Sequence, residues 1–171
     1  MVAKSLWVQL TTLLFIIQGW RQTEGCLEQE RIALFQLKSF FNQPTKLKDW
    51  VDVKGSNCCQ WKRVECNITS KRVIGLHLNF TRQSNLYGYL NVSLFLPFEK
   101  LKSLYLGGNK IAGFVDNKGE KVQPMMNLEV LDLFGNLLMN NDLTYLKGLS
   151  SLKSLNIGGN QLEGSIDIRG M

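Results

Sequence analysis

Four cysteines carry the most definite chemistry in this sequence of 171 residues. An even number of cysteines in a chain with an export signal predicts two disulfides. A zinc site would need a spacing such as Cys-x-x-Cys and further ligands, and neither is present, so no metal site is expected. A bond between the adjacent Cys58 and Cys59 would be strained. Two pairings remain: Cys26 with Cys58 and Cys59 with Cys66, or Cys26 with Cys59 and Cys58 with Cys66.

Three asparagines, Asn67, Asn79 and Asn91, lie in Asn-x-Ser/Thr motifs. In an exported protein this motif accepts N-linked glycans, which places the asparagine on the surface. We therefore expect glycosylation at all three positions. Asn79 differs from the other two because it directly follows a predicted strand at 76–78, where a glycan would crowd one face of that strand.

The residues needed for catalysis are missing. The sequence has one histidine, His77, and its cysteines are assigned to disulfides, so neither a Ser-His-Asp triad nor a Cys-His pair has convincing parts. Phosphate-binding and dinucleotide-binding glycine motifs are absent. The carboxylates Glu28, Glu30 and Asp52 lie near the N-terminus, where we expect them to be solvated. The sequence predicts a protein that is not an enzyme and that has no cofactor.

Residues 1–25 have the pattern of a secretory signal peptide. A lysine near the start precedes a mostly apolar stretch of 12 residues at 6–17, and small residues precede Cys26. Twelve residues are too few to cross a bilayer, which needs about 20, so the chain is expected to be secreted without a transmembrane segment. The net charge of +6 could attract an acidic polysaccharide or protein. The charges are interspersed, however, which favours an ordinary solvated surface and no nucleic-acid partner.

The elements that must position these residues follow from a repeated spacing. The pattern Leu-x-x-Leu-x-Leu-x-x-Asn occurs at 101–109 and 128–136, and at 152–160 with isoleucine as the third apolar residue. A fourth copy at 73–78 lacks the asparagine. The three asparagines lie 27 and 24 residues apart, within the range of leucine-rich repeats. The sequence predicts an α/β leucine-rich-repeat solenoid of about four stacked repeats, with a short parallel sheet on the concave face.

The asparagines that end these repeats, Asn109, Asn136 and Asn160, are predicted to be structural. A buried amide at a turn can bond backbone groups that would otherwise be unpaired. Before the repeats, residues 27–42 are predicted to form an amphipathic helix that ends before Pro44. Its apolar face is expected to contain Ile32, Leu34, Phe35, Leu37 and Phe41, while Glu28, Glu30 and Arg31 are its polar residues.

The segment around the cysteines resembles the N-terminal cap of plant leucine-rich-repeat receptor-like proteins. The resemblance rests on the Cys-Leu-Glu-Gln-Glu-Arg run that starts at Cys26, on Trp50, on the Cys-Cys-x-Trp-x-x-Val-x-Cys run at 58–66 and on the Arg-Val-Ile-x-Leu-x-Leu run at 72–78. It implies a disulfide-stapled cap at 26–70 and repeats at 71–171, the last of them uncapped. It also implies that Cys26 pairs with Cys58 and Cys59 with Cys66.

The sequence departs from the family pattern at several positions. Arg63 stands where the family has a glycine, and the Gly-x-Ile-Pro turn of the family has Asp in place of Pro at 113–116 and 164–167. The chain also reaches residue 171 without a C-terminal cap or membrane helix. We therefore expect the N-terminal part, or a truncated form, of a receptor-like ectodomain.

The resemblance implies a non-enzymatic, extracellular recognition module that binds peptide or protein ligands in cell-surface signalling or defence. A co-receptor kinase and a plasma-membrane location are expected only for a full-length form. The alternative is a secreted inhibitor of microbial cell-wall-degrading enzymes, similar to polygalacturonase-inhibiting proteins.

The ligand-binding residues are predicted from strand geometry. In each repeat the residue between the last two apolar positions projects outward from the sheet. These residues are His77, Tyr105, Asp132 and Asn156. A second outward column contains Gly75, Ser103, Val130 and Ser154. Lys102, Glu129 and Lys153 lie beside it, and we expect them to form ion pairs between strands.

Overall fold

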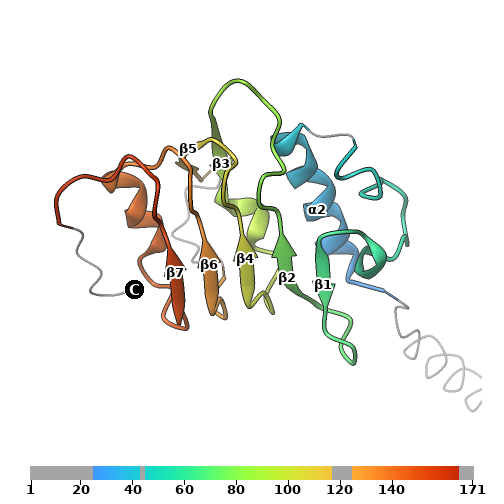
Figure 1. The fold of residues 1–171 in the computed structure, drawn as a ribbon. Helices are drawn as coiled ribbons and strands as arrows, with labels where there is room; N and C mark the ends of the chain where they lie inside the picture. The colour runs from blue at the N-terminus through green and yellow to red at the C-terminus, as the bar shows by residue number, and fades with distance from the viewer. Residues whose placement is uncertain (1–24, 43–44, 117–124, 166–171) are drawn as a thin grey trace, which may run out of the picture.

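The computed structural model of the protein describes residues 25–42, 45–116 and 125–165 (Figure 1). The predicted signal peptide, residues 1–25, lies outside the described residues except for Gly25, and so does the end of the predicted turn at 164–167. Within the described ranges, no helix is both long and apolar enough to cross a membrane.

The predicted N-terminal helix is confirmed as α2 (Glu28–Phe41), although its expected faces are partly wrong. Leu34, Leu37 and Phe41 are fully buried, but Ile32 and Phe35 are exposed. Instead, Glu30 and Arg31 belong to the buried set of the helix.

These two charged residues can be buried because each has polar partners. The Glu30 carboxylate accepts hydrogen bonds from Arg72 Nε at 2.9 Å and from the backbone N–H groups of Val73 and Leu27. The Arg31 guanidinium donates to Glu28 and to Asp52. Burial raises the pKa of the Glu30 carboxyl, while the hydrogen bond from Arg72 opposes this effect. The expectation that Glu30 is solvated is therefore wrong.

Two disulfides hold the cap together, and all four cysteines take part in them. Cys26–Cys58 joins the residues before α2 to the 3₁₀ helix η1 (Cys58–Gln60), and Cys59–Cys66 joins η1 to strand β1 (Val64–Cys66). The structure thus contains the pairing that the resemblance implies.

Removal of the second disulfide should destabilise the domain. A Cys59→Ser/Cys66→Ser variant loses a bond that closes a sequence separation of only 7 residues. Chain entropy for a loop of this length predicts a loss of about 2.5 kcal/mol in the free energy of unfolding. Urea denaturation of both proteins measures the difference. An unchanged unfolding midpoint would show that the short loop is already ordered in the unfolded chain.

The predicted solenoid is confirmed by a five-stranded sheet in the order β1-β2-β4-β6-β7. Its parallel strands are β2 (Val73–His77), β4 (Ser103–Tyr105), β6 (Val130–Asp132) and β7 (Ser154–Asn156), one for each predicted repeat. Leu76, Leu104 and Leu131 are paired in register and buried behind the sheet. Strand β1 pairs antiparallel with β2, which the repeat pattern did not predict.

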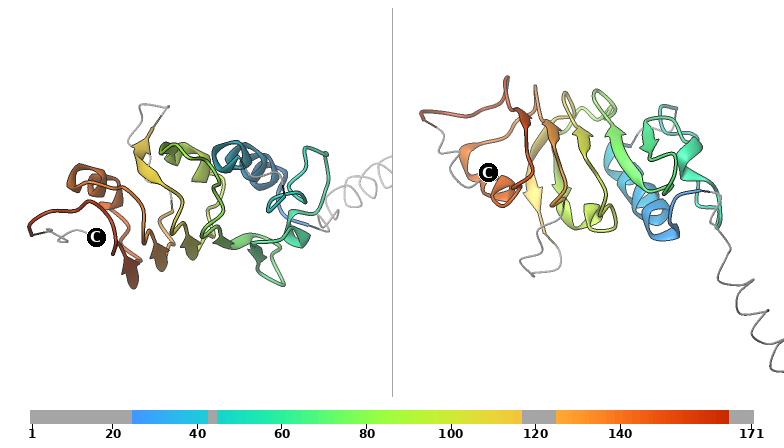
Figure 2. Two further views of the ribbon diagram at one scale, coloured as in Figure 1. Left: turned by 45° about the horizontal axis from the view of Figure 1, so that its top comes forward. Right: turned by 90° about the horizontal axis from the view of Figure 1, so that it is seen from below.

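Among the described residues, a second sheet and three 3₁₀ helices accompany the main sheet. Strands β3 (Gly88–Asn91) and β5 (Ile111–Val115) form a parallel pair. The remaining 3₁₀ helices are η2 (Val92–Phe95) and η3 (Asn140–Leu146). Figure 2 shows that α2 and these helices lie on one side of the stack, away from the five-stranded sheet. The sheet therefore keeps one face uncovered.

The predicted structural role of the asparagines is confirmed. The Asn136 side-chain oxygen accepts hydrogen bonds from the N–H groups of Asn109 and Ile111 at 3.0 and 3.1 Å. Its amide nitrogen donates to the carbonyl oxygens of Leu106 and Leu133 at 3.1 and 2.9 Å. Each such asparagine therefore ties its own turn to the preceding repeat. Equivalent bonds occur at Asn109 and Asn160.

Candidate functional site

The four predicted ligand-binding residues share one face of the sheet. Strand pairing places His77 opposite Tyr105, Tyr105 opposite Asp132 and Asp132 opposite Asn156. All four side chains are at least partly exposed. With strands about 4.8 Å apart, they form a row roughly 15 Å long. We call this row, together with the adjacent column Gly75, Ser103, Val130 and Ser154, the sheet face.

An aromatic pair forms one end of the row. The rings of His77 and Tyr105 are stacked with centroids 4.9 Å apart and an angle of 12° between their planes. His77 Nε2 lies 3.2 Å from Glu65 Oε2. Glu65 comes from β1 and was not predicted as a site residue, because three residues carry no recognisable strand pattern. The Tyr105 ring is held in place on the sheet face by its stacking on His77, which in turn contacts the Glu65 carboxylate.

Asp132, in the middle of the row, is held by a residue from two repeats earlier. Asn79 Nδ2 donates a hydrogen bond to Asp132 Oδ2 at 2.9 Å, and Asn79 Oδ1 accepts one from Gly107 N at 2.6 Å. Asp132 Oδ1 also accepts a bond from Phe134 N. A Cβ atom on Gly107 would lie 3.2 Å from the Phe134 carbonyl oxygen and 3.3 Å from Asn79 Oδ1, so a side chain there would crowd both. Asn79 is therefore a further residue of this site.

The adjacent column is shallow because its residues are small. A Cβ atom on Gly75 would lie 2.7 Å from Glu65 Oε2 and 2.8 Å from Ser103 Oγ, so a side chain there would require the ends of both neighbouring side chains to move. Ser103, Val130 and Ser154 continue the column across β4, β6 and β7. This column therefore runs beside the row from His77 to Asn156 across the same strands.

The expected ion pairs between strands are present beside this column. Glu129 lies 3.4 Å from Lys102 Nζ and 2.8 Å from Lys153 Nζ. Hydrogen bonds from the two lysines hold the pKa of the Glu129 carboxyl below its usual value, and the bond from Lys153 has the larger effect. The Glu129 carboxylate therefore bridges two lysines, and the three residues together keep a net charge of +1.

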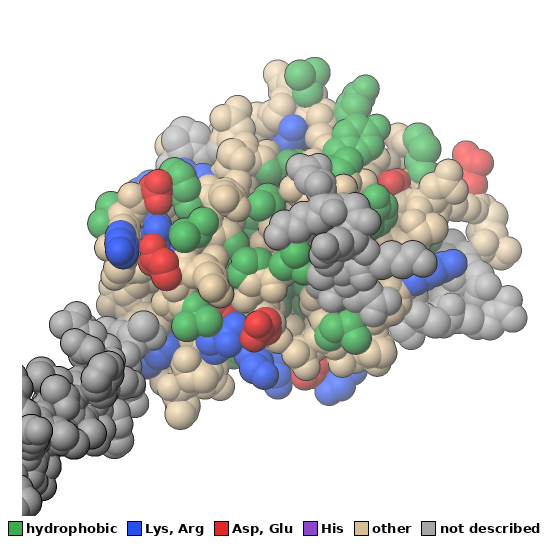
Figure 3. Space-filling view, turned by 180° about the vertical axis from the view of Figure 1, so that it is seen from behind, with side chains coloured by type: hydrophobic (Ala, Val, Ile, Leu, Met, Phe, Trp, Pro, Cys, Tyr) green, Lys and Arg blue, Asp and Glu red, His purple; other side chains and the backbone are tan. Residues whose placement is uncertain are grey.

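Two exposed phenylalanines border the row where the strands end. Phe80 is 61% exposed and Phe134 is 46% exposed. The Phe80 ring covers Gly108 of the next repeat, and the Phe134 ring lies near Gly159. On the opposite side of the molecule, hydrophobic side chains are interspersed with charges of both signs (Figure 3). The sheet face and its border therefore combine aromatic and polar groups on one regular surface.

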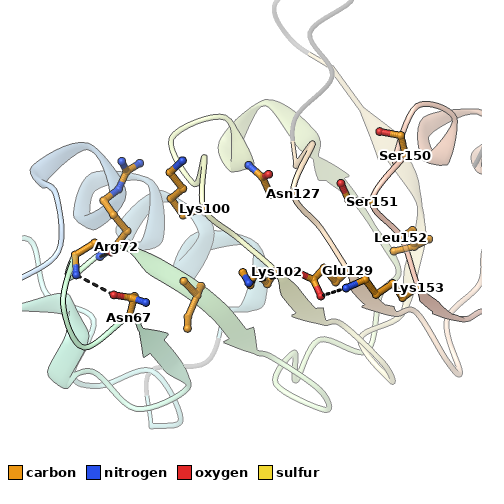
Figure 4. Close-up of a pocket in the computed structure, with 12 residues that line it drawn as sticks. Asn67, Arg72, Lys100, Lys102, Asn127, Glu129, Ser150, Ser151, Leu152 and Lys153 are labelled. Atoms are coloured by element: carbon orange, nitrogen blue, oxygen red, sulfur yellow. Dashed lines mark hydrogen bonds and ion pairs between the residues drawn. The ribbon is translucent and has the colours of Figure 1, made fainter.

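A broad hollow of about 940 Å³ lies beside the beginnings of the strands (Figure 4). Its cations are largely compensated, because Arg72 pairs with Glu30 and Glu99, and Glu129 pairs with two of the lysines. The lining of the hollow thus contains four cations and one carboxylate, and two carboxylates outside it, Glu30 and Glu99, pair with Arg72. Its charged lining residues are Arg72, Lys100, Lys102, Glu129 and Lys153.

Comparisons with known proteins agree with this architecture. The family described as leucine rich repeat N-terminal domain matches residues 27–67, and the leucine rich repeat family matches residues 148–166. Receptor-like protein 9a of Arabidopsis thaliana is 38% identical over 165 residues, which cover 95% of this chain and 17% of that protein. Receptor-like protein 9b of the same plant is 40% identical over 148 residues, covering 85% of this chain and 16% of that protein.

Among solved structures, the leucine-rich-repeat ectodomain of the Arabidopsis receptor kinase HAESA, determined with a peptide hormone ligand, is 31% identical. The match covers 80% of this chain and 22% of that one, with a TM-score of 0.59. Cap, disulfides, repeats and relatives agree with one another. The chain therefore belongs to the leucine-rich-repeat family of plant receptor-like proteins, and it spans about one sixth of the length of the relatives 9a and 9b.

Proposed function

We propose that this chain is a non-enzymatic recognition module, part of an extracellular receptor-like ectodomain, and that it binds a peptide or protein ligand on the sheet face. The cap at 26–70 and the repeats at 71–171 are its two parts. The observation that carries the proposal is the register of His77, Tyr105, Asp132 and Asn156 across four strands on one uncovered face.

The regular register of the sheet face supports an extended ligand. A chain laid across the strands would rest on the small residues from Gly75 to Ser154 and would contact the taller row along one side. Tyr105 is the proposed anchor, since a rigid amphipathic ring gives a large contact area at low entropic cost. Asp132 supplies acceptor oxygens beside it, and Asn79 keeps its carboxylate in a fixed position.

The peptide-bound HAESA ectodomain provides a precedent for the ligand class in a related fold. Because this chain spans only about one sixth of its relatives, further ligand contacts and a co-receptor kinase belong to the proposal for a longer form. Such a form is proposed to act at the plasma membrane.

Loss of the Tyr105 ring should weaken ligand binding. Peptides selected from a displayed random library on the wild-type chain provide the probe. We expect Tyr105→Ala to raise their dissociation constants about fivefold or more, which corresponds to about 1 kcal/mol for a hot-spot residue. Biolayer interferometry with immobilised protein gives the comparison.

Lys147→Ala is the matched control, because Lys147 is an exposed residue that follows η3, away from the sheet. Its dissociation constants should equal those of the wild type. Equal losses of affinity in both variants, or peptides whose dissociation constants do not change in Tyr105→Ala, would rule out the sheet face as the binding site.

A further inference from the structure

The three Asn-x-Ser/Thr motifs lie in different chemical settings. A glycan is attached to the side-chain nitrogen, Nδ2, so the partners of this atom distinguish the motifs from one another. Two of the three asparagines use only their side-chain oxygen within the described part of the chain. The third uses both polar atoms.

Asn67 and Asn91 shape local turns through their oxygens. Asn67 Oδ1 accepts hydrogen bonds from the N–H groups of Thr69 and Ser70 at 2.9 and 2.8 Å, in the exposed turn between β1 and β2. Asn91 Oδ1 accepts one from Ser93 N at 3.0 Å, where η2 begins. Neither bond requires Nδ2, and both asparagines are at least partly exposed. A sugar on Nδ2 therefore leaves both turns intact.

Both polar atoms of the Asn79 side-chain amide form hydrogen bonds. Its Oδ1 binds Gly107 N in the second repeat, and its Nδ2 binds the Asp132 carboxylate in the third, 53 residues away. Thr81, which completes this motif, is fully buried, and its N–H bonds to Asn109 Oδ1. Thr81 thus occupies the place that an asparagine takes in the other repeats. Both ends of the motif accordingly have structural roles that need no glycan.

We propose that the folded protein carries N-linked glycans on Asn67 and Asn91, and that Asn79 stays unmodified and serves as a clamp across three repeats. In the transfer, Nδ2 loses a proton and bonds the anomeric carbon of a lipid-linked oligosaccharide. The bond from that carbon to phosphate breaks, and the lipid diphosphate leaves with the electron pair. At Asn79 the attached sugar would replace one of the two Nδ2 hydrogens, crowd the Asp132 carboxylate and project over the sheet face.

This distribution keeps the candidate ligand surface clear. Asn67 lies at one end of the hollow beside the beginnings of the strands (Figure 4). Asn91 lies at the end of β3, in the second sheet. Neither position belongs to the row from His77 to Asn156. The assignment of glycans does not depend on the identity of any ligand, or on whether one binds.

Site-resolved mass spectrometry of the full chain secreted by plant cells tests the assignment. Treatment with an N-glycosidase in heavy-oxygen water converts each glycosylated asparagine into a labelled aspartate. We expect label at Asn67 and Asn91 and none at Asn79. Asn67→Gln and Asn91→Gln should each remove one glycan, whereas Asn79→Gln should remove none. A glycan on Asn79, or an unmodified Asn67 or Asn91, would overturn the assignment.

An exchange of the two partners tests the clamp itself. Asn79→Asp sets two carboxylates against each other and should lower the thermal midpoint of the deglycosylated protein. The double variant Asn79→Asp/Asp132→Asn restores one amide and one carboxylate in reversed positions, so most of the loss should be recovered. Failure of the exchange to recover stability would show that the Asn79–Asp132 contact does not hold the repeats together.

Discussion

An Asn136→Ala variant should lose about 4 kcal/mol of unfolding free energy. The side chain makes four hydrogen bonds to backbone groups, and the residue is only 3% exposed. Alanine leaves the N–H groups of Asn109 and Ile111 without an acceptor, whereas the Leu106 and Leu133 carbonyl oxygens keep hydrogen bonds from Asn109 Nδ2 and Asn160 Nδ2. Each buried unpaired N–H group costs about 1–3 kcal/mol, so the two together account for the expected loss. Equilibrium denaturation followed by circular dichroism measures the loss.

Asn127→Ala is the matched control in the same repeat. Asn127 is exposed and donates a single side-chain hydrogen bond, to the Glu99 carbonyl oxygen. Its replacement should change the free energy of unfolding by less than about 1 kcal/mol. Equal losses for the two variants would mean that water replaces the Asn136 amide without cost.

The repeats could be predicted because their pattern is dense and physically constrained. Two strictly spaced leucines fix which face of each strand is buried, and a parallel register then aligns the residues between them. For that reason the row from His77 to Asn156 was predicted residue by residue. The structural role of Asn109, Asn136 and Asn160 was predicted from the same spacing, because a buried amide needs hydrogen-bond partners.

Contacts between distant segments could not be predicted. Strand β1 has only three residues, too few for its Val-Glu-Cys alternation to indicate a strand, so neither its antiparallel pairing nor the place of Glu65 beside His77 was apparent. The Asn79–Asp132 contact joins residues of the first and third repeats above a glycine. Nothing in the local spacing indicates a contact that skips one repeat.

Arg63 and Phe80 stand where the family pattern or the later repeats have glycine, and both have a positive φ. Arg63, at the place of a family glycine, has a φ of +72°. Phe80 has a φ of +51°, and the equivalent residues of later repeats are Gly108, Gly135 and Gly159, with φ between +63° and +65°. The left-handed turn is therefore kept in spite of the side chain, at a cost of about 1–2 kcal/mol for a residue other than glycine. The presence of Arg63 or Phe80 in place of glycine therefore does not mean that the turn has a different backbone conformation.

The expected faces of α2 were partly wrong for a different reason. Periodicity assigns charged residues to solvent, but it cannot show that a partner from a distant segment neutralises them. Arg72 comes from the turn before β2 and reaches Glu30, 42 residues earlier in the chain. A buried ion pair of this kind also makes a strong prediction about stability, because removal of one partner leaves the other uncompensated.

Glu30→Ala should accordingly lose about 3 kcal/mol of unfolding free energy. The Glu30 side chain is fully buried, and its removal leaves the N–H groups of Val73 and Leu27 without their acceptor. Breaking a buried ion pair costs about 3–5 kcal/mol, and the lower value applies because Arg72 keeps a contact with Glu99. Asp52→Ala is the control, since this exposed carboxylate pairs with Arg31 and its loss should cost at most about 1 kcal/mol. Urea denaturation at neutral pH compares the two variants. If Glu30→Ala proved as mild as Asp52→Ala, the cap would not depend on its buried carboxylate for docking onto the first repeat.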